Sequence, residues 1–95
     1  MPTTEPFNME HVERLRNHML LSVPQFCQLI GVSKMTYSRW LRGAVPRKDV
    51  NDKLRRAMRK LLAVVQEEQY PTPEVHRMSR GERFNNLLEL LKKHH

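Results

Sequence analysis

Apolar residues recur at intervals of three and four along several segments of the chain, which is the spacing of one face of an α-helix. In the first segment this stripe consists of Met9, Val12, Leu15 and Met19. Asn8 precedes the stripe and is a residue type that caps helix N-termini well. The pattern therefore predicts a first helix from Asn8 to about Met19 or Leu20.

Two short helices joined by a tight turn are predicted next. Ser22 and Gln25 have the spacing of a capping box, and Pro24 lies in the first turn, where its missing N–H costs little. The buried face of this second helix consists of Phe26, Cys27, Leu29 and Ile30. Gly31 favours the left-handed conformation that ends many helices, and Ser33 is already suited to cap the next one.

The third helix is predicted from Lys34 to Arg42, with Gly43 as its stop. Tyr37 and Trp40 are three residues apart on this helix. Because that spacing puts both rings on one face, we expect them in the core in preference to stacking on nucleic-acid bases.

Asp49 is expected to open a fourth helix, with Asp52 also in the first turn, beside the positive end of the helix dipole. Its apolar stripe consists of Val50, Leu54, Ala57 or Met58, Leu61, and Val64 or Val65. The helix is expected to run to about Gln69, because the prolines of the following Tyr70-Pro71-Thr72-Pro73 segment interrupt it.

After a short turn at 74–78, Ser79 and Glu82 repeat the capping-box spacing ahead of a final apolar helix. The large apolar residues of that helix are Phe84, Leu87, Leu88, Leu90 and Leu91. Strand-like alternation, repeats and low-complexity tracts are absent from the sequence. We predict an all-α bundle of about five helices, in which residues 1–69 form the main domain and residues 70–95 a helical extension.

The charge of the chain is concentrated in one segment. Seventeen Lys and Arg against ten Asp and Glu give a net charge of +7 over 95 residues. Between Ser33 and Lys60 there are ten basic residues against only Asp49 and Asp52, whereas the rest of the chain has seven basic and eight acidic residues. Such a charge calls for a polyanionic partner, nucleic acid first and an anionic membrane second.

A membrane role fits the sequence poorly. The longest apolar run, Leu61 to Val65, is far short of the ~20 residues of a bilayer span, and the basic residues do not flank one exposed apolar stripe. The first six residues lack both a positive n-region and a following apolar stretch, so the sequence predicts no secretory signal. The lone Cys27 forms no intramolecular disulfide, is expected to be a buried small residue, and suits the cytoplasm.

Catalytic and metal-binding motifs are not found either. The sequence has no P-loop, nucleophile elbow, Cys-x-x-Cys motif, or grouping of carboxylates and histidine near a glycine-rich loop. His11 and His18 are two helical turns apart on one face, but no cysteine or carboxylate pair completes a zinc set. We therefore expect no enzymatic activity, no cofactor and no metal, and we give His94 and His95 no role.

The segment from Leu21 to Pro46 has the features of a helix-turn-helix. Cys27 is small where the second and third helices would cross closely, and Gly31 follows four residues later, where the turn needs a positive φ. Val32, with the two aromatic residues of the third helix, supplies the apolar wedge between the helices. Each feature alone is weak, but together they are specific for this motif.

At this level the segment Leu21–Gly43, followed by Pro46, resembles the helix-turn-helix of phage repressor and Cro-type (XRE-like) regulators. With the fourth helix included, the resemblance covers about half of the chain. It implies a lambda-repressor-like fold of four or five helices, binding to double-stranded operator DNA of palindromic or pseudo-palindromic sequence, and a homodimer. Residues 66–95 follow no pattern of that family.

The resemblance implies base-reading positions that correspond here to Lys34, Met35 and Arg39. Lys34 and Arg39 can donate to guanine O6 and N7, whereas Met35 replaces a polar residue and suits a thymine methyl group. Ser33, Thr36 and Ser38 could touch a phosphate or a base, although capping is the main role expected of Ser33. Phosphate contacts are expected from Arg42, Arg47 and Lys48. Four basic residues of the fourth helix either form a solvated face or attract DNA without a defined contact: Arg55, Arg56, Arg59 and Lys60.

The last helix has two alternative roles. Phe84, Leu87, Leu88 and Leu91 could form a dimer interface, or the helix could fold back onto its own bundle. The sequence favours a transcriptional regulator, a repressor of phage or mobile-element type, acting in the prokaryotic nucleoid or a phage-infected cell. Two alternatives are an autoregulatory antitoxin whose C-terminal segment binds a toxin, and a basic module that docks on an acidic protein.

Overall fold

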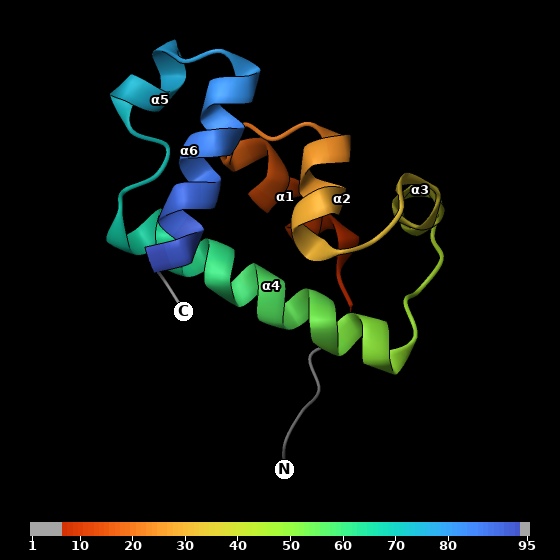
Figure 1. Cartoon of the computed structure of the whole chain (residues 1–95). Coiled ribbons are helices and arrows are strands. Elements are labelled where there is room, and N and C mark those ends of the chain that lie inside the picture. The colour runs from red at the N-terminus through yellow and green to blue at the C-terminus, as the bar shows by residue number, and fades with distance from the viewer. Residues whose placement is uncertain (1–6, 94–95) are drawn as a thin grey trace.

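The computed structural model describes residues 7–93, in which all of the regular secondary structure is helical. The expectations about the first six residues and about His94 and His95 lie outside the described residues. Six helices follow one another in this part of the chain (Figure 1): α1 (Met9–His18), α2 (Val23–Ile30), α3 (Lys34–Leu41), α4 (Lys48–Glu67), α5 (Pro73–Arg77) and α6 (Arg80–Lys93). The predicted all-α class is therefore confirmed.

The predicted caps of the first two helices are present. The Asn8 side chain accepts hydrogen bonds from the backbone N–H groups of Glu10 and His11, at 3.0 and 3.4 Å. Ser22 and Gln25 form the reciprocal capping box, in which the Gln25 N–H donates to Ser22 Oγ and the Ser22 N–H donates to Gln25 Oε1. These short helices therefore begin where local side-chain chemistry satisfies their first N–H groups.

Several helix boundaries differ from the sequence prediction by one or two residues: α1 ends at His18, with Met19 as its C-cap, and α4 ends at Glu67. Helix α3 ends at Leu41, and Arg42 is its C-cap. Helix α4 begins at Lys48 after an Arg47 N-cap that makes no side-chain cap hydrogen bond, so Asp49 lies inside the first turn and does not open the helix. The carboxylate of Asp49 still lies beside the positive end of the helix dipole, which is favourable without a capping bond.

The C-terminal part forms one more helix than predicted. Thr72 caps the five-residue α5 by accepting the Val75 N–H, in the segment expected to be a short turn. The predicted capping box of α6 is confirmed, because the Glu82 N–H donates to Ser79 Oγ and the Ser79 N–H donates to Glu82 Oε1.

One hydrophobic core joins all six helices. In Figure 1 the long α4 extends beneath the shorter helices, with α6 across one half of it and α3 above its other end. The most deeply buried side chains come from every helix and the α4–α5 connection: Val12, Met19, Phe26, Tyr37, Leu54, Leu61, Val64, Tyr70, Val75 and Leu87. No helix of residues 7–93 has the length and apolar character to cross a membrane.

Candidate nucleic-acid interface

The turn between α2 and α3 depends on Gly31. Its φ of +77° is left-handed, and such a φ costs a residue with a Cβ about 1–2 kcal/mol. The Cys27 carbonyl accepts hydrogen bonds from the N–H groups of Gly31 and Val32, at 2.9 and 3.1 Å. The Ser33 side chain then accepts from the Thr36 N–H at 3.1 Å, which starts α3 immediately after the turn. Only three residues, 31–33, thus separate α2 from α3.

Aromatic side chains fix α3 against the other helices. Tyr37 is fully buried and Trp40 is 4% exposed, as predicted. The Tyr37 ring meets Phe26 of α2 edge-on with centroids 5.8 Å apart, and Phe7 meets Trp40 in the same way at 5.6 Å. Cys27 is buried as expected, and this burial raises the pKa of its thiol. The rings therefore hold α3 by its inner face and are not available for stacking on bases.

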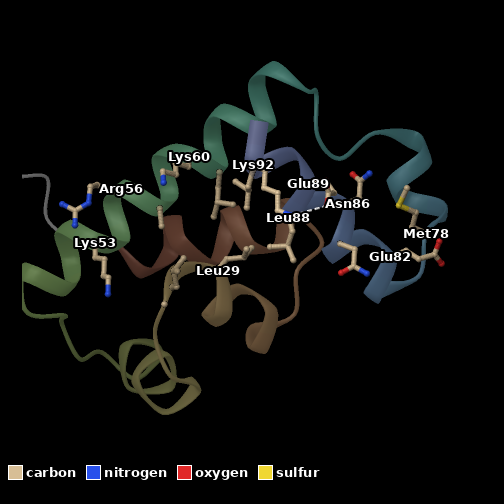
Figure 2. A pocket seen from close by; sticks show the side chains of 16 residues that line it. Leu29, Lys53, Arg56, Lys60, Met78, Glu82, Asn86, Leu88, Glu89 and Lys92 are labelled. Carbon is tan, nitrogen blue, oxygen red and sulfur yellow. Dashed lines mark hydrogen bonds and ion pairs between the residues drawn. The ribbon is translucent and has the colours of Figure 1, made fainter. Parts of the chain in front are cut away.

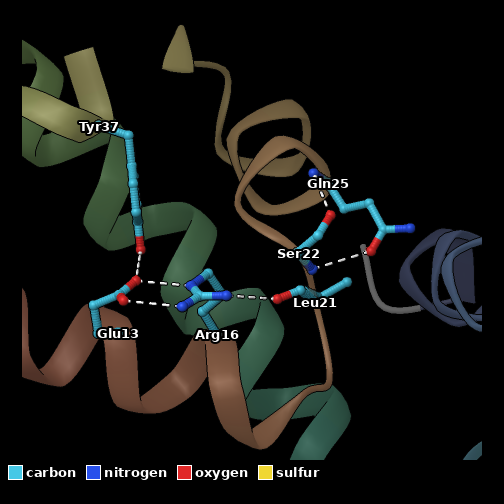
Figure 3. A network of polar contacts seen from close by, with 6 residues as sticks. All are labelled: Glu13, Arg16, Leu21, Ser22, Gln25 and Tyr37. Carbon is cyan, nitrogen blue, oxygen red and sulfur yellow. Dashed lines mark hydrogen bonds and ion pairs between the residues drawn. The ribbon is translucent and has the colours of Figure 1, made fainter. Parts of the chain in front are cut away.

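A polar network that the sequence did not predict ties α1 to α3 (Figure 3). The Tyr37 hydroxyl donates to Oε2 of Glu13 on α1. Arg16 donates from Nε and Nη2 to the two Glu13 oxygens, at 2.7 and 2.9 Å, and from Nη1 to the Leu21 carbonyl at 2.9 Å. The hydrogen bond from Arg16 lowers the pKa of Glu13, whereas burial raises the pKa of Tyr37. One carboxylate therefore joins α1 and α3.

The opposite face of α3 is directed to solvent. At about 100° per residue, five polar or long side chains fall within an arc of roughly 140° on this helix. They are Lys34, Met35, Ser38, Arg39 and the C-cap residue Arg42. All but the half-buried Ser38 are exposed, and Met35 reaches 66%. The three predicted base-reading residues thus share the free face of the helix that follows the turn.

Several of these side chains are already ordered by contacts within α3. Arg39 Nη2 lies 3.8 Å from Met35 Sδ, and Arg42 Nη2 donates to Ser38 Oγ at 3.2 Å. The hydroxyl groups of Ser33 and Thr36 are 2.9 Å apart. The two hydroxyls are thus engaged with each other at the helix start, while the cationic head groups lie over the exposed face.

The predicted phosphate-binding residues after α3 lie close to it in the chain. Arg47 is the N-cap of α4 and Lys48 is its first residue, and both are exposed. Figure 1 shows α3 and the N-terminal end of α4 at the same end of the molecule. The structure therefore brings the proposed base-reading and phosphate-binding residues to one end of the fold.

Two apolar residues beside that face are exposed, which the sequence did not predict. Leu41 is 49% exposed and Val45 is 73% exposed. A third such residue on the same segment is Met35. The 3.6-residue periodicity puts Leu41 about 40° from Tyr37, beside the buried stripe, so its spacing gave no signal of this exposure. These residues add apolar surface to a mainly cationic end of the molecule.

The last helix packs on its own bundle. Leu87 is fully buried, and Phe84, Leu90 and Leu91 are partly buried against the same core. Leu88 is half-buried. Of the four residues proposed for dimerisation, Leu87 is therefore committed to the core of its own chain.

A groove of about 1170 Å³ lies between α2, α4 and α6. In Figure 2, Lys53, Arg56 and Lys60 of α4 face it from one side, while Glu89 of α6 lies on the other. Apolar side chains along it include Leu29, Leu88 and Leu91. We call this surface the α2–α4–α6 groove. It is lined by side chains of both charges.

Within residues 7–93, no group of three or more His, Cys, Asp or Glu side chains is arranged to hold a metal ion. His11 and His18 instead line a second groove between α1 and α4. Comparison of the chain with protein-family models, with curated proteins and with solved structures finds no match.

Proposed function

We propose that this chain is a sequence-specific DNA-binding transcriptional regulator, a repressor of phage or mobile-element type that works in the cytoplasm. One observation carries the proposal: a tight left-handed turn at Gly31 presents the exposed, cationic face of α3. With eight residues, α3 is about 12 Å long, similar to the width of the DNA major groove. Its N-terminal end would lie against the bases.

The side chains of α3 divide into base contacts and phosphate contacts. Arg39 offers two parallel N–H donors to guanine O6 and N7, and Lys34 offers one charged group to the same atoms. Met35 lies against Arg39 and would contact a thymine methyl group. Arg47 and Lys48, at the start of α4, would bind the phosphates that flank the groove.

The experiment is selection of DNA from a random pool, followed by titration of the selected and of random duplexes. We expect affinity to fall steeply between about 50 and 200 mM salt. Arg39→Ala should lose about 1–3 kcal/mol on the selected site and relax preference at one base pair. Arg47→Ala should weaken both duplexes similarly. Arg77→Ala, at an exposed arginine of α5, is the matched control and should bind like the parent.

Three outcomes would reject the proposal. The pool selection could yield no enriched sequence, or the chain could be indifferent to DNA at low salt, as expected of a basic protein-interaction module. The third is an equal effect of Arg39→Ala on selected and random DNA, which would remove base reading from α3.

Operator recognition by a single helix-turn-helix covers only a few base pairs, so we also propose a homodimer that reads two half-sites. The exposed parts of Leu88 and Leu91, in the α2–α4–α6 groove, are available for this contact. The mixed charges of the groove suit a second copy, because the acidic side of one groove can face the basic side of the other.

Deleting residues 79–95 would be a poor test of this interface, since it removes Leu87 from the core. Leu88→Glu leaves the core side chains in place. We expect it to convert the dimer into a monomer in sedimentation equilibrium, whereas Asn17→Glu, on the exposed surface of α1, should leave the dimer unchanged. A dimer of undiminished stability in Leu88→Glu would exclude this groove as the interface.

A further inference from the structure

The groove between α1 and α4 has a different chemistry from the one beneath α6. It has a volume of about 690 Å³. Its apolar floor is formed by Leu15, Met58, Leu62 and Val65. Leu62 is 44% exposed, which makes it one of the few large apolar side chains of residues 7–93 directed to solvent. We call this surface the α1–α4 groove.

The polar residues around this floor carry no negative charge. They are Arg14, His11 and His18 on α1, and Arg55 and Arg59 on α4. Arg14 forms an exposed ion pair of 3.2 Å with Glu10, one turn earlier on α1. Within residues 7–93, neither Arg55 nor Arg59 forms an ion pair. Two guanidinium groups therefore border an apolar floor without a carboxylate partner.

The length of the groove suits a short helix. On α4 the lining residues extend from Arg55 to Val65, and on α1 from His11 to His18. At 1.5 Å per residue these stretches are about 15 Å and 11 Å long, or two to three helical turns. An amphipathic helix lays apolar residues at a spacing of three and four into such a groove.

We propose that the α1–α4 groove binds an acidic amphipathic helix of a partner protein. The apolar stripe of that helix would cover Leu62 and Met58, and its Asp or Glu side chains would pair with Arg55 and Arg59. An isologous contact with a second copy is disfavoured, because it would bring the same cationic border against itself. The apolar floor disfavours DNA, whose phosphates offer it no apolar surface.

This surface is separate from the proposed DNA-binding helix and from the dimer groove. On α4, Arg55 and Arg59 lie within roughly 40° of each other, whereas Lys53 and Lys60 lie about 140–160° away from Arg55. These two lysines line the α2–α4–α6 groove. The two pairs provide a matched comparison on a single helix.

The test is display selection of random peptides of about 16 residues on the full chain, with the selected peptides then measured by fluorescence anisotropy. We expect enriched peptides to carry Asp or Glu together with apolar residues at helical spacing. Leu62→Asp and Arg55→Glu/Arg59→Glu should each weaken binding at least about tenfold. Lys53→Glu/Lys60→Glu, with the same change of charge, should keep the affinity within about twofold.

Binding of the selected operator DNA is measured in parallel. Leu62→Asp should leave DNA affinity unchanged, so failure of either proposal is visible independently of the other. The groove proposal is overturned if no peptide is enriched, if enriched peptides are not acidic, or if the two charge-reversal pairs weaken binding equally. It is overturned as well if the parent chain binds anionic phospholipid vesicles and Leu62→Asp abolishes that binding without affecting the peptides.

Discussion

Replacing Glu13 by Gln tests whether the network between α1 and α3 stabilises the fold. The substitution preserves the size of the side chain and one acceptor oxygen, but it removes the charge. Glu13 accepts two hydrogen bonds from Arg16 and one from Tyr37. In the variant, the amide group can accept from only one of these partners at full strength.

The expected cost follows from the burial of the partners. A hydrogen bond to a charged group contributes about 1.5–3 kcal/mol. The side chains of Arg16 and Glu13 are 16% and 26% exposed, so solvent screens the interaction only in part. Arg16 keeps its bond to the Leu21 carbonyl. We therefore expect Glu13→Gln to lower the free energy of unfolding by about 2–3 kcal/mol.

Urea denaturation and thermal unfolding followed by circular dichroism measure this change. For a chain of this size, 2 kcal/mol corresponds to a fall in Tm of about 8–16 °C. The control is Glu10→Gln, one turn earlier on the same helix. Its ion pair with Arg14 is exposed, and such pairs contribute little.

The stabilisation by Glu13 should decrease at low pH. The pKa of Glu13 is lowered in the folded protein, so its contribution is present above the ordinary pKa of a glutamate and is lost as the pH falls through the folded value. The stability difference between the parent and Glu13→Gln should shrink when the pH falls from about 7 to below 4. Equal stabilities of the Glu13 and Glu10 variants, or a difference that does not change with pH, would refute the reasoning.

Three further predictions concern single residues. Gly31→Ala should lower the free energy of unfolding by about 1–2 kcal/mol. The cost comes from the positive φ alone, because nothing lies within 4 Å of an added Cβ. Chemical denaturation measures this loss, and an unchanged free energy of unfolding would contradict a left-handed turn at Gly31. The buried Tyr70 hydroxyl has no hydrogen-bond partner within residues 7–93, so Tyr70→Phe should be neutral or stabilising by about 1 kcal/mol in the same assay, and a loss would disprove this. Leu87→Ala, at a fully buried side chain, should cost about 2–5 kcal/mol, whereas Leu88→Ala in the monomer should cost far less; similar losses would place both side chains in equivalent surroundings.

Local sequence chemistry was sufficient to predict the short helices α2 and α3 and the turn between them. The caps at Ser22 and Ser33 and the glycine between them depend on residues at most three or four positions away, so their geometry can be inferred directly. The prediction that Asp49 opens α4 is wrong, because the helix begins at Lys48 although Asp is the better capping residue type. Arg47 is extended, with φ −63° and ψ 160°, and the helix begins immediately after it.

Contacts between distant segments were beyond such reasoning. The spacing of Glu13 and Arg16 permits their ion pair, but nothing local indicates that Tyr37, 24 residues further on, would complete it. The two grooves likewise depend on how α4 packs against α1 and α6. The choice between a folded-back and a free last helix also needed the packing of Leu87, since its apolar spacing suits both.

The position of Leu87 has a consequence for how the protein folds while it is being synthesised. It is the last fully buried residue of the described chain, and it lies on α6, which packs against α4, an element that is synthesised earlier. On the ribosome, the helix-turn-helix can form from local contacts while the core beside α4 still lacks α6. Products of premature termination would then carry the folded α2–turn–α3 segment on an incomplete core, and cellular proteases would degrade them in preference to the chain that includes α6.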